Sequence, residues 1–250
     1  MKRILVTGGA SGIGLAIARR FAAQGAQTLI CDIDQSALDR ACEDMPGLIG
    51  TCCDVADATR IDALFATLST TLGGLDVLVN NVGIGGPTLP ADQLPSEDWQ
   101  QVLDINLTGT FEVTRRAIPL LKRTAGTIIN MSSAAGRFGY PNRIAYAVTK
   151  WGLVGFTKTL AMELGAHDVT VNAILPGAVG GDRFDRVIQG RAQLSGRSFE
   201  EEVRDGLAAQ SLKRIVDPAH IADLALFLTT AAGRSISGQI LPMDGDLQHG

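Results

Sequence analysis

Short apolar runs alternate with longer segments of helical periodicity along most of the chain. The runs resemble strands in length and in their content of Val, Ile and Leu, and they occupy residues 2–7, 28–32, 48–54, 75–81, 126–133, 169–175 and 239–243. Helical spacing follows them at 12–24, from about Gln35, from about Asp57, in a long helix ending near Arg123, and from about Ala145. The alternation predicts an α/β fold, a Rossmann-like doubly wound parallel sheet of about seven strands with helices on both faces.

No linker interrupts this alternation, so we predict a single domain over residues 1–250. Two segments fit neither pattern and are predicted to be long loops. The first is 83–95, and the second runs from Pro176-Gly177 to about Ser198.

Composition limits the classes of partner. Hydrophobic residues make up 46% of the chain and charged residues 19%, as in a protein with a sizeable core. The net charge of -4 argues against nucleic acid and anionic membranes as partners. No apolar run has the length of a signal-peptide core or a membrane span. The spacing of the four cysteines matches no disulfide framework, so we expect reduced, buried thiols. The three histidines, His167, His220 and His249, lie far apart, so we expect no metal site and a cytoplasmic protein.

The segment TGGASGIG (7–14) joins the first predicted strand to the first helix. Its glycines Gly8, Gly12 and Gly14 allow a tight turn and a close approach of the backbone to a ligand. The helix amino terminus beyond them offers N–H groups and a positive dipole end to a pyrophosphate. A glycine cluster alone also suits a plain turn, but its position between strand and helix favours a dinucleotide site.

The second strand ends at Asp32, where a dinucleotide fold carries the acidic residue that binds the adenosine ribose. A carboxylate there accepts hydrogen bonds from ribose hydroxyls and repels the 2′-phosphate of NADP. Ser11, Ile33 and Asp34 supply no cation to offset that repulsion. The alternative is a turn-forming aspartate that caps the next helix. The pattern predicts NAD rather than NADP.

With these motifs, the chain closely resembles the short-chain dehydrogenase/reductase family over nearly its whole length. The matching motifs are TGxxxGxG at 7–14, Asp54-Val55, Asn80-Asn81-Val82-Gly83, NLTG at 106–109, Ser133 with Tyr146 and Lys150 in YxxxK, and Pro176-Gly177. Two departures are Ala178-Val179-Gly180-Gly181, where many members carry a threonine that binds the carboxamide, and Asp244-Gly245-Asp246 in place of DGG.

Tyr146 and Lys150 stand one helical turn apart and therefore share a helix face. A phenol has a pKa near 10, and a nearby ammonium and a nicotinium ring would favour its phenolate. Such a tyrosine can exchange a proton with an alcohol or a ketone oxygen as hydride moves. A bare YxxxK also suits a half-exposed helix face, but Ser133, 13 residues before Tyr146, completes the catalytic spacing better than Ser132 does.

The resemblance implies further roles. Ser133 positions the reacting oxygen, Lys150 also holds the nicotinamide ribose, and Asn106 takes part in a proton relay. The cofactor site that we expect comprises Gly8, Ser11, Gly12, Ile13, Gly14, Asp32, Asp54, Val55, Asn81, Gly83, Tyr146, Lys150, Pro176, Gly177 and Val179.

Arginines are the candidate residues for substrate recognition. Arginines flank the catalytic stretch and crowd a substrate lid expected over about 177–210, at positions 137, 143, 183, 186, 191 and 197. Arginine suits a carboxylate, sulfonate or phosphate. The alternatives are a solvated charge pattern and contacts between subunits. The substrate contacts that we expect are Ser133, Arg137, Arg143, Tyr146 and Arg183.

The favoured function is an NAD-dependent oxidoreductase acting on a small polar or anionic secondary alcohol or its ketone. One alternative is a 3-oxoacyl-thioester reductase, and another is a non-catalytic dinucleotide sensor. Family resemblance also implies a homotetramer or homodimer.

Overall fold

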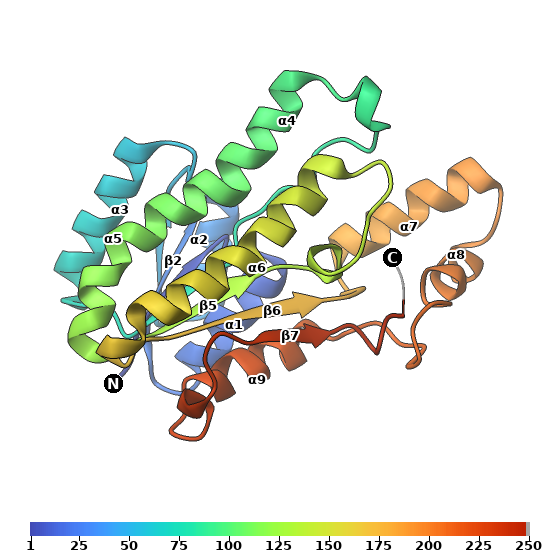
Figure 1. Cartoon of the computed structure of the whole chain (residues 1–250). Helices are drawn as coiled ribbons and strands as arrows, with labels where there is room; N and C mark the ends of the chain where they lie inside the picture. The colour runs from blue at the N-terminus through green and yellow to red at the C-terminus, as the bar shows by residue number, and fades with distance from the viewer. Residues whose placement is uncertain (249–250) are drawn as a thin grey trace.

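The computed structural model describes residues 1–248, apart from the side chains of five residues in one helix, Asp182, Arg183, Val187, Arg191 and Leu194. Its seven strands form one parallel sheet in the order β3-β2-β1-β4-β5-β6-β7 (Figure 1). They are β1 (Arg3–Thr7), β2 (Gln27–Asp32), β3 (Leu48–Cys52), β4 (Val77–Asn80), β5 (Thr127–Met131), β6 (Thr170–Pro176) and β7 (Ile240–Met243). The predicted doubly wound parallel sheet is confirmed.

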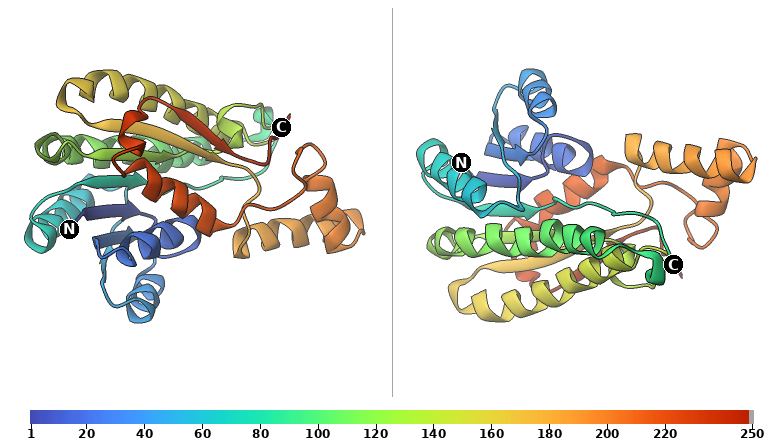
Figure 2. Two further views of the ribbon diagram at one scale, coloured as in Figure 1. Left: turned by 90° about the horizontal axis from the view of Figure 1, so that it is seen from below. Right: turned by 90° about the horizontal axis from the view of Figure 1, so that it is seen from above.

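Helices cover both faces of this sheet, as the two views of Figure 2 show. One face packs against α1 (Gly12–Ala22), α2 (Gln35–Asp44) and α9 (Pro218–Leu228), and the other against α3 (Ala58–Leu72), α5 (Gly109–Thr124) and α6 (Ile144–Leu164). Neighbouring strand residues point to opposite faces. Ile4 and Val6 therefore join the first apolar core, whereas Leu5 joins the second.

The helix predicted to end near Arg123 is built from three consecutive pieces. Helix α4 (Ser96–Leu103) passes into a π-helical turn (Asp104–Thr108) and then into α5, which ends at Thr124. Single-turn π segments inside α-helices are often found at functional sites. The loop predicted over 83–95 is confirmed, with a 3₁₀ turn at Ala91–Gln93 as its one regular piece.

The second predicted loop is wrong. Its span contains α7 (Asp182–Ser195), and α8 (Phe199–Gly206) follows within the expected lid. The left-handed Gly196 ends α7, and a capping box between Ser198 and Glu201 begins α8. Both helices lie beyond the carboxyl ends of β6 and β7 (Figure 1).

The sheet brings β1 and β4 side by side, although other elements separate them in the chain. The connection after β1 leads to α1 on one face, and the connection after β4 leads to α4 and α5 on the other. Connections that leave in opposite directions open a crevice at the carboxyl ends of the two strands. The glycine turn and the Asn80-Asn81 pair both lie at this crevice.

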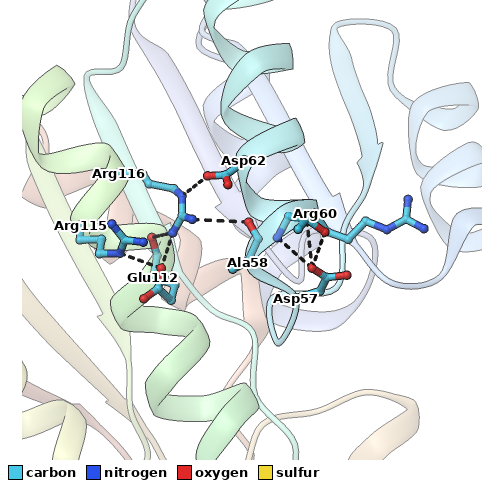
Figure 3. Close-up of polar contacts among 8 residues, drawn as sticks. Asp57, Ala58, Arg60, Asp62, Glu112, Arg115 and Arg116 are labelled. Carbon is cyan, nitrogen blue, oxygen red and sulfur yellow. Dashed lines mark hydrogen bonds and ion pairs between the residues drawn. The ribbon is translucent and has the colours of Figure 1, made fainter.

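A charged network joins α3 to α5 on the outer surface (Figure 3). Arg116 contacts Asp62 of α3 at 2.6 Å and also pairs with Glu112 one turn earlier in α5. Glu112 receives a second bond from Arg115 at 2.7 Å. Hydrogen bonds from Arg116 lower the pKa of both Asp62 and Glu112 below their ordinary values. At neutral pH these contacts fasten α5 to α3, while Asp57 caps the start of α3.

Arg3 and Asp76 join the amino-terminal ends of β1 and β4. The Asp76 carboxylate accepts from Arg3 Nε and Nη2, both at 2.9 Å, and from the Arg3 backbone N–H at 2.8 Å. Burial by itself would raise the pKa of Asp76, but the hydrogen bonds from Arg3 outweigh it and the pKa is lowered. The contact therefore stabilises the fold when the carboxylate is ionised.

Replacing this carboxylate should destabilise the protein in a pH-dependent way. We expect Asp76→Asn to lower the free energy of unfolding at pH 7 by about 1–2 kcal/mol, because charged hydrogen bonds are lost. Since the folded pKa is depressed, the stabilisation is present above the unfolded pKa of about 4 and is lost as pH falls through it toward the folded value. Urea titrations of both proteins at several pH values should show the difference shrinking below about pH 4. A difference that stayed constant would contradict this account.

No helix within residues 1–248 is both long and apolar enough to cross a membrane. The four cysteines are free. Cys31 and Cys53 are buried as expected, but Cys42 is only half-buried, and Cys52 is exposed because it lies at the end of the edge strand β3.

Candidate active site

The glycine turn closes tightly against the start of α1. Gly8 and Gly12 have φ of +61° and +52°, in the region that favours glycine. A Cβ on Gly14 would lie 2.1 Å from the Gly8 carbonyl oxygen, so this position has no room for a side chain. Ser11 precedes the helix without a side-chain cap, which leaves the first-turn N–H groups available to an anion.

Asp32 lies beside the glycine turn. Its Oδ2 accepts from the Ala10 N–H at 3.2 Å, and its Oδ1 accepts from the Asp34 N–H at 3.3 Å. The cap of α2 is Asp34, which accepts from the Ala37 N–H at 3.0 Å. The alternative of Asp32 as the helix cap is therefore wrong. The adjacent Ile33 side chain is 68% exposed and brings no charge.

Asn81 connects the end of β4 to the glycine turn. Its Nδ2 donates to the Thr7 and Gly8 carbonyl oxygens at 3.1 and 2.9 Å. Its backbone N–H donates to Thr7 Oγ1 at 3.0 Å. The predicted cofactor residue thus shapes the turn through its side chain.

Asp54 and Val55 follow β3, the strand that pairs with β2 and therefore lies beside Asp32. Asp54 Oδ1 accepts from the Ala56 N–H at 2.9 Å, and Val55 is buried. The last glycine of NLTG packs directly on this segment, because a Cβ on Gly109 would lie 2.6 Å from the Val55 carbonyl oxygen. The NLTG motif therefore lets α5 approach the segment after β3.

Tyr146 and Lys150 point into the same region from α6. Lys150 Nζ lies 5.5 Å from the centroid of the Tyr146 ring and donates to the Met131 carbonyl oxygen at 2.8 Å. Lys150 is buried, at 4% exposure. Gly83 lies next to it, since a Cβ there would be 3.3 Å from Nζ. The ammonium is thus held rigidly beside the phenol ring.

The two serines at the end of β5 differ in how they are bonded. Ser132 is buried and donates from Oγ to the Lys150 carbonyl oxygen at 2.8 Å. Ser133 Oγ accepts from the Ala135 N–H at 3.2 Å, and no residue of the described chain accepts its proton. The Ser133 hydroxyl can therefore still donate to a ligand, as its predicted role requires, whereas Ser132 holds α6 against β5.

Asn106 lies fully buried in the π-helical turn. Its amide pairs with the Ile84 backbone, accepting at 2.8 Å and donating at 2.9 Å, and donates to Thr149 Oγ1 at 3.0 Å. These bonds attach the 83–95 loop to the helix residue that precedes Lys150. The predicted proton relay stays a prediction, and the observed role is structural support of the lysine.

A small cavity opens where these elements meet, at the carboxyl ends of β4, β5 and β6. It is lined by Ile13, Asn81, Gly83, Met131, Ser132, Tyr146, Lys150 and Pro176. Six of these were predicted as cofactor residues. Met131 and Ser132 were not predicted to line the site. Met131 contributes a backbone carbonyl, for which no side-chain pattern gives a signal.

The segment after β6 is fastened on both sides. A Cβ on Gly177 would lie 2.8 Å from Asp244 Cα, so a glycine at this position is needed for the carboxy-terminal segment to pack here. Val179 forms a parallel bridge with Val216, supported by the Val216 N–H bond to the Ala178 carbonyl oxygen at 2.8 Å. Val179 is thereby set at the base of α7.

The structure separates the predicted arginines. Arg137 donates to the Leu247 carbonyl oxygen at 2.7 Å and lies 3.7 Å from the Asp244 carboxylate, which ties it to the carboxy-terminal segment. Arg143 has its guanidinium carbon 5.6 Å from the Tyr146 ring centroid. The side chain of Arg183 lies outside the part that the structure describes.

No cluster of three His, Cys, Asp or Glu side chains suited to a metal exists among the described residues, which exclude His249.

Comparisons with known proteins agree with this geometry. Residues 8–247 match the family described as "Enoyl-(Acyl carrier protein) reductase". D-beta-hydroxybutyrate dehydrogenase of Cupriavidus necator is 37% identical over 252 residues, covering 98% of this chain and 96% of that protein.

Two solved structures have the same fold. An actinorhodin polyketide ketoreductase variant with NADPH has a TM-score of 0.92 and 33% identity, covering 98% of this chain and 96% of that one. NAD⁺-bound xylitol dehydrogenase has a TM-score of 0.90 and 29% identity, covering 98% of each chain. Together with the matched motifs and the parallel sheet, these similarities show that the chain belongs to the short-chain dehydrogenase/reductase family of nicotinamide-dependent oxidoreductases.

Proposed function

We propose that the protein is an NAD-dependent dehydrogenase or reductase acting on a small polar secondary alcohol or its ketone, with Tyr146 as general acid and base. The observation that carries the proposal is the pairing of the Tyr146 ring with Lys150 Nζ at 5.5 Å, beside a cavity at the crevice of the sheet. A fixed cation next to a phenol is the arrangement that proton exchange with an alcohol requires.

The residues of the crevice fit a dinucleotide. The turn leaves no space for a Cβ at Gly14, as expected where backbone must approach a pyrophosphate, and α1 begins without a side-chain cap. We assign the pyrophosphate to Ser11, Gly12 and Ile13, the adenosine ribose to Asp32, and the adenine side to Asp54 and Val55. A bound nicotinamide supplies the hydride acceptor in oxidation and the hydride donor in reduction.

The protein residues do the positioning and the proton transfer. Ser133 donates a hydrogen bond to the reacting oxygen and orients it toward the Tyr146 hydroxyl. Tyr146 takes the alcohol proton in oxidation and returns it in reduction. Lys150, held by the Met131 carbonyl, stabilises the phenolate electrostatically.

Asp32 should determine the choice of cofactor. We expect Asp32→Ala to raise the KM for NAD about 10- to 100-fold, since charged hydrogen bonds to the ribose are lost. Adding Ile33→Arg should shift the preference toward NADP, because the exposed residue 33 then offers a cation to the 2′-phosphate. The measurement is kcat/KM for both cofactors.

Asp34→Asn is the matched control, since it removes a neighbouring charge and keeps an acceptor at the cap of α2. It should leave the ratio of the two cofactors unchanged. A wild-type enzyme that prefers NADP would contradict the assignment to Asp32.

A 3-oxoacyl-thioester reductase is the second candidate, and the similarity to a polyketide ketoreductase with NADPH favours it. Two assays distinguish the candidates. The first follows NADH formation from a panel of secondary alcohols, polyols and hydroxy acids. The second follows oxidation of NADPH and of NADH with the N-acetylcysteamine thioester of 3-oxobutyrate. Faster thioester reduction with NADPH would overturn our proposal, and absence of both activities with tight NADH binding would favour a dinucleotide sensor.

We also propose that the chain assembles into a dimer or a tetramer. Large apolar side chains are exposed on α5 and α6, including Phe111 and Trp151 at 50% and 51% exposure. Large exposed apolar side chains favour contacts between copies of the chain. Light scattering on the purified protein should give two or four times the monomer mass.

A further inference from the structure

We propose that Arg143 binds a carboxylate of the substrate, so that the alcohol is a short hydroxy acid and the ketone an oxo acid. This inference rests on the proposed function, which makes Tyr146 the group that meets the reacting oxygen. It assigns the recognition of an anion to one arginine, whereas the sequence offered several arginines for this role.

Arg143 is placed within reach of a small molecule held at Tyr146. It directly precedes α6, and its guanidinium carbon lies 5.6 Å from the Tyr146 ring centroid. Lys150 Nζ lies 5.5 Å from the same centroid. Two cations therefore stand near the proton-transfer group, and the second is not part of the lysine and tyrosine pair that the chemistry needs.

The charge of Arg143 is not neutralised by the described part of the protein. No carboxylate there lies within 4.0 Å of it, whereas Arg137 has Asp244 as a partner and Arg197 has both Glu202 and Asp205. A guanidinium beside the Tyr146 ring and without a carboxylate partner among the described residues is suited to bind one from a ligand.

The hydrogen bonds of Arg143 leave one edge of the guanidinium for such a ligand. Nη1 donates to Thr88 Oγ1 at 2.8 Å, while Nε is buried and has no hydrogen-bond partner among the residues that the structure describes. The remaining Nε–Nη2 edge is the one that carboxylates bind with two parallel bonds. The centroid of the Tyr140 ring lies 5.8 Å from the guanidinium carbon, and Tyr140 is 40% exposed.

Arg143 also has a structural task, which any test must separate from substrate binding. Its bond to Thr88, together with the Leu89 N–H bond to the Asn142 carbonyl oxygen at 2.9 Å, fastens the 83–95 loop to the segment before α6. A purely structural role predicts that acidic and neutral substrates suffer equally when Arg143 is replaced. Recognition of a carboxylate predicts that only acids suffer.

The experiment compares each acid with its neutral ester. The probes are 3-hydroxybutyrate and 3-hydroxypentanoate, each with its methyl ester, assayed by NADH formation with the wild type, Arg143→Gln and Arg143→Lys. We expect the wild type to prefer the acids. Arg143→Gln should lose about 10- to 100-fold in kcat/KM for the acids, mainly through KM, with the esters changed by less than about threefold. Arg143→Lys should recover part of the loss, because lysine restores the positive charge but cannot form the two parallel hydrogen bonds of a guanidinium.

Arg137→Gln is the comparison variant, since the carboxy-terminal segment already occupies its guanidinium. It should leave the ratio of acid to ester unchanged. Calorimetric titration of malonate into the protein with saturating NADH gives a readout that does not depend on turnover. Malonate should bind the wild type and bind Arg143→Gln at least about 10-fold more weakly. If Arg143→Gln does not fold, Arg143→Lys and the wild-type preference still decide the question.

The inference is overturned if the wild type oxidises esters as well as acids, or if Arg143→Gln lowers both equally. Either result leaves the proposed function intact, because alcohols are still oxidised. If no secondary alcohol is oxidised with NAD although NADH binds, the proposed function fails and this inference fails with it.

Discussion

Tyr146→Phe should lower kcat by about 1,000-fold while leaving the affinity for NADH within about threefold of the wild type. The change removes the hydroxyl that exchanges a proton with the substrate oxygen and keeps the ring beside Lys150. General acid and base catalysis by a positioned side chain contributes about 100- to 10,000-fold, so the loss should appear in turnover rather than in cofactor binding. Initial rates at saturating alcohol and fluorescence titration with NADH separate the two quantities.

Tyr140→Phe is the matched control, because Tyr140 is the other tyrosine of the chain and its ring lies 6.4 Å from that of Tyr146. It removes a phenol hydroxyl from the same neighbourhood, and we expect most of the turnover to remain. More than about a tenth of the wild-type kcat in Tyr146→Phe would refute the role of Tyr146 as acid and base.

Gly14→Ala should weaken cofactor binding strongly and destabilise the fold. The added Cβ would lie 2.1 Å from the Gly8 carbonyl oxygen and 2.5 Å from Asn81 Nδ2, so the turn has to open. We expect about 3 kcal/mol of lost stability from this overlap. NADH affinity should fall about 100-fold, because the N–H groups of the turn move out of position. Urea unfolding and NADH fluorescence measure the two effects.

Gly165→Ala controls for the loss of a glycine. Gly165 is exposed at the end of α6, has φ of -57°, and no atom would lie within 4 Å of its Cβ. The variant should be as stable as the wild type or more stable by up to about 1 kcal/mol, because alanine restricts the unfolded chain. If Gly14→Ala behaved like this control, the close turn would not be essential.

The strand and helix alternation could be predicted because each buried strand is a short Val, Ile and Leu run and each amphipathic helix repeats its apolar positions. The strand register was not predicted, because strands buried on both faces, such as β4 and β5, show no alternation of apolar and polar positions that would fix it. The region of α7 and α8 could not be predicted in this way. Its sequence is rich in polar residues and glycines, and the signal that was present, the Ser198 and Glu201 capping box, is local and easily read as a turn.

Asp32 illustrates a question that sequence spacing left open. An aspartate after a strand can cap the following helix or face a ligand, and Asp34 stands two residues further on with the same chemistry. The structure gives the cap to Asp34 because its carboxylate lies over the first turn of α2, and Asp32 instead bonds the glycine turn. Only the tertiary structure distinguishes the aspartate that caps the helix from the aspartate that lies beside the glycine turn.

The sequence by itself determined the sheet, the glycine turn, and the placement of Tyr146 and Lys150 on one helix face, because each follows from local periodicity or from a spacing within a few residues. Tertiary structure alone decided which groups meet across long separations in the chain. It attached Lys150 to the Met131 carbonyl, used Asn106 to hold the loop after β4, tied Arg137 to the carboxy-terminal segment and joined Arg143 to Thr88. Such contacts depend on how packed elements place backbone groups and long side chains, and no pattern along the chain encodes them.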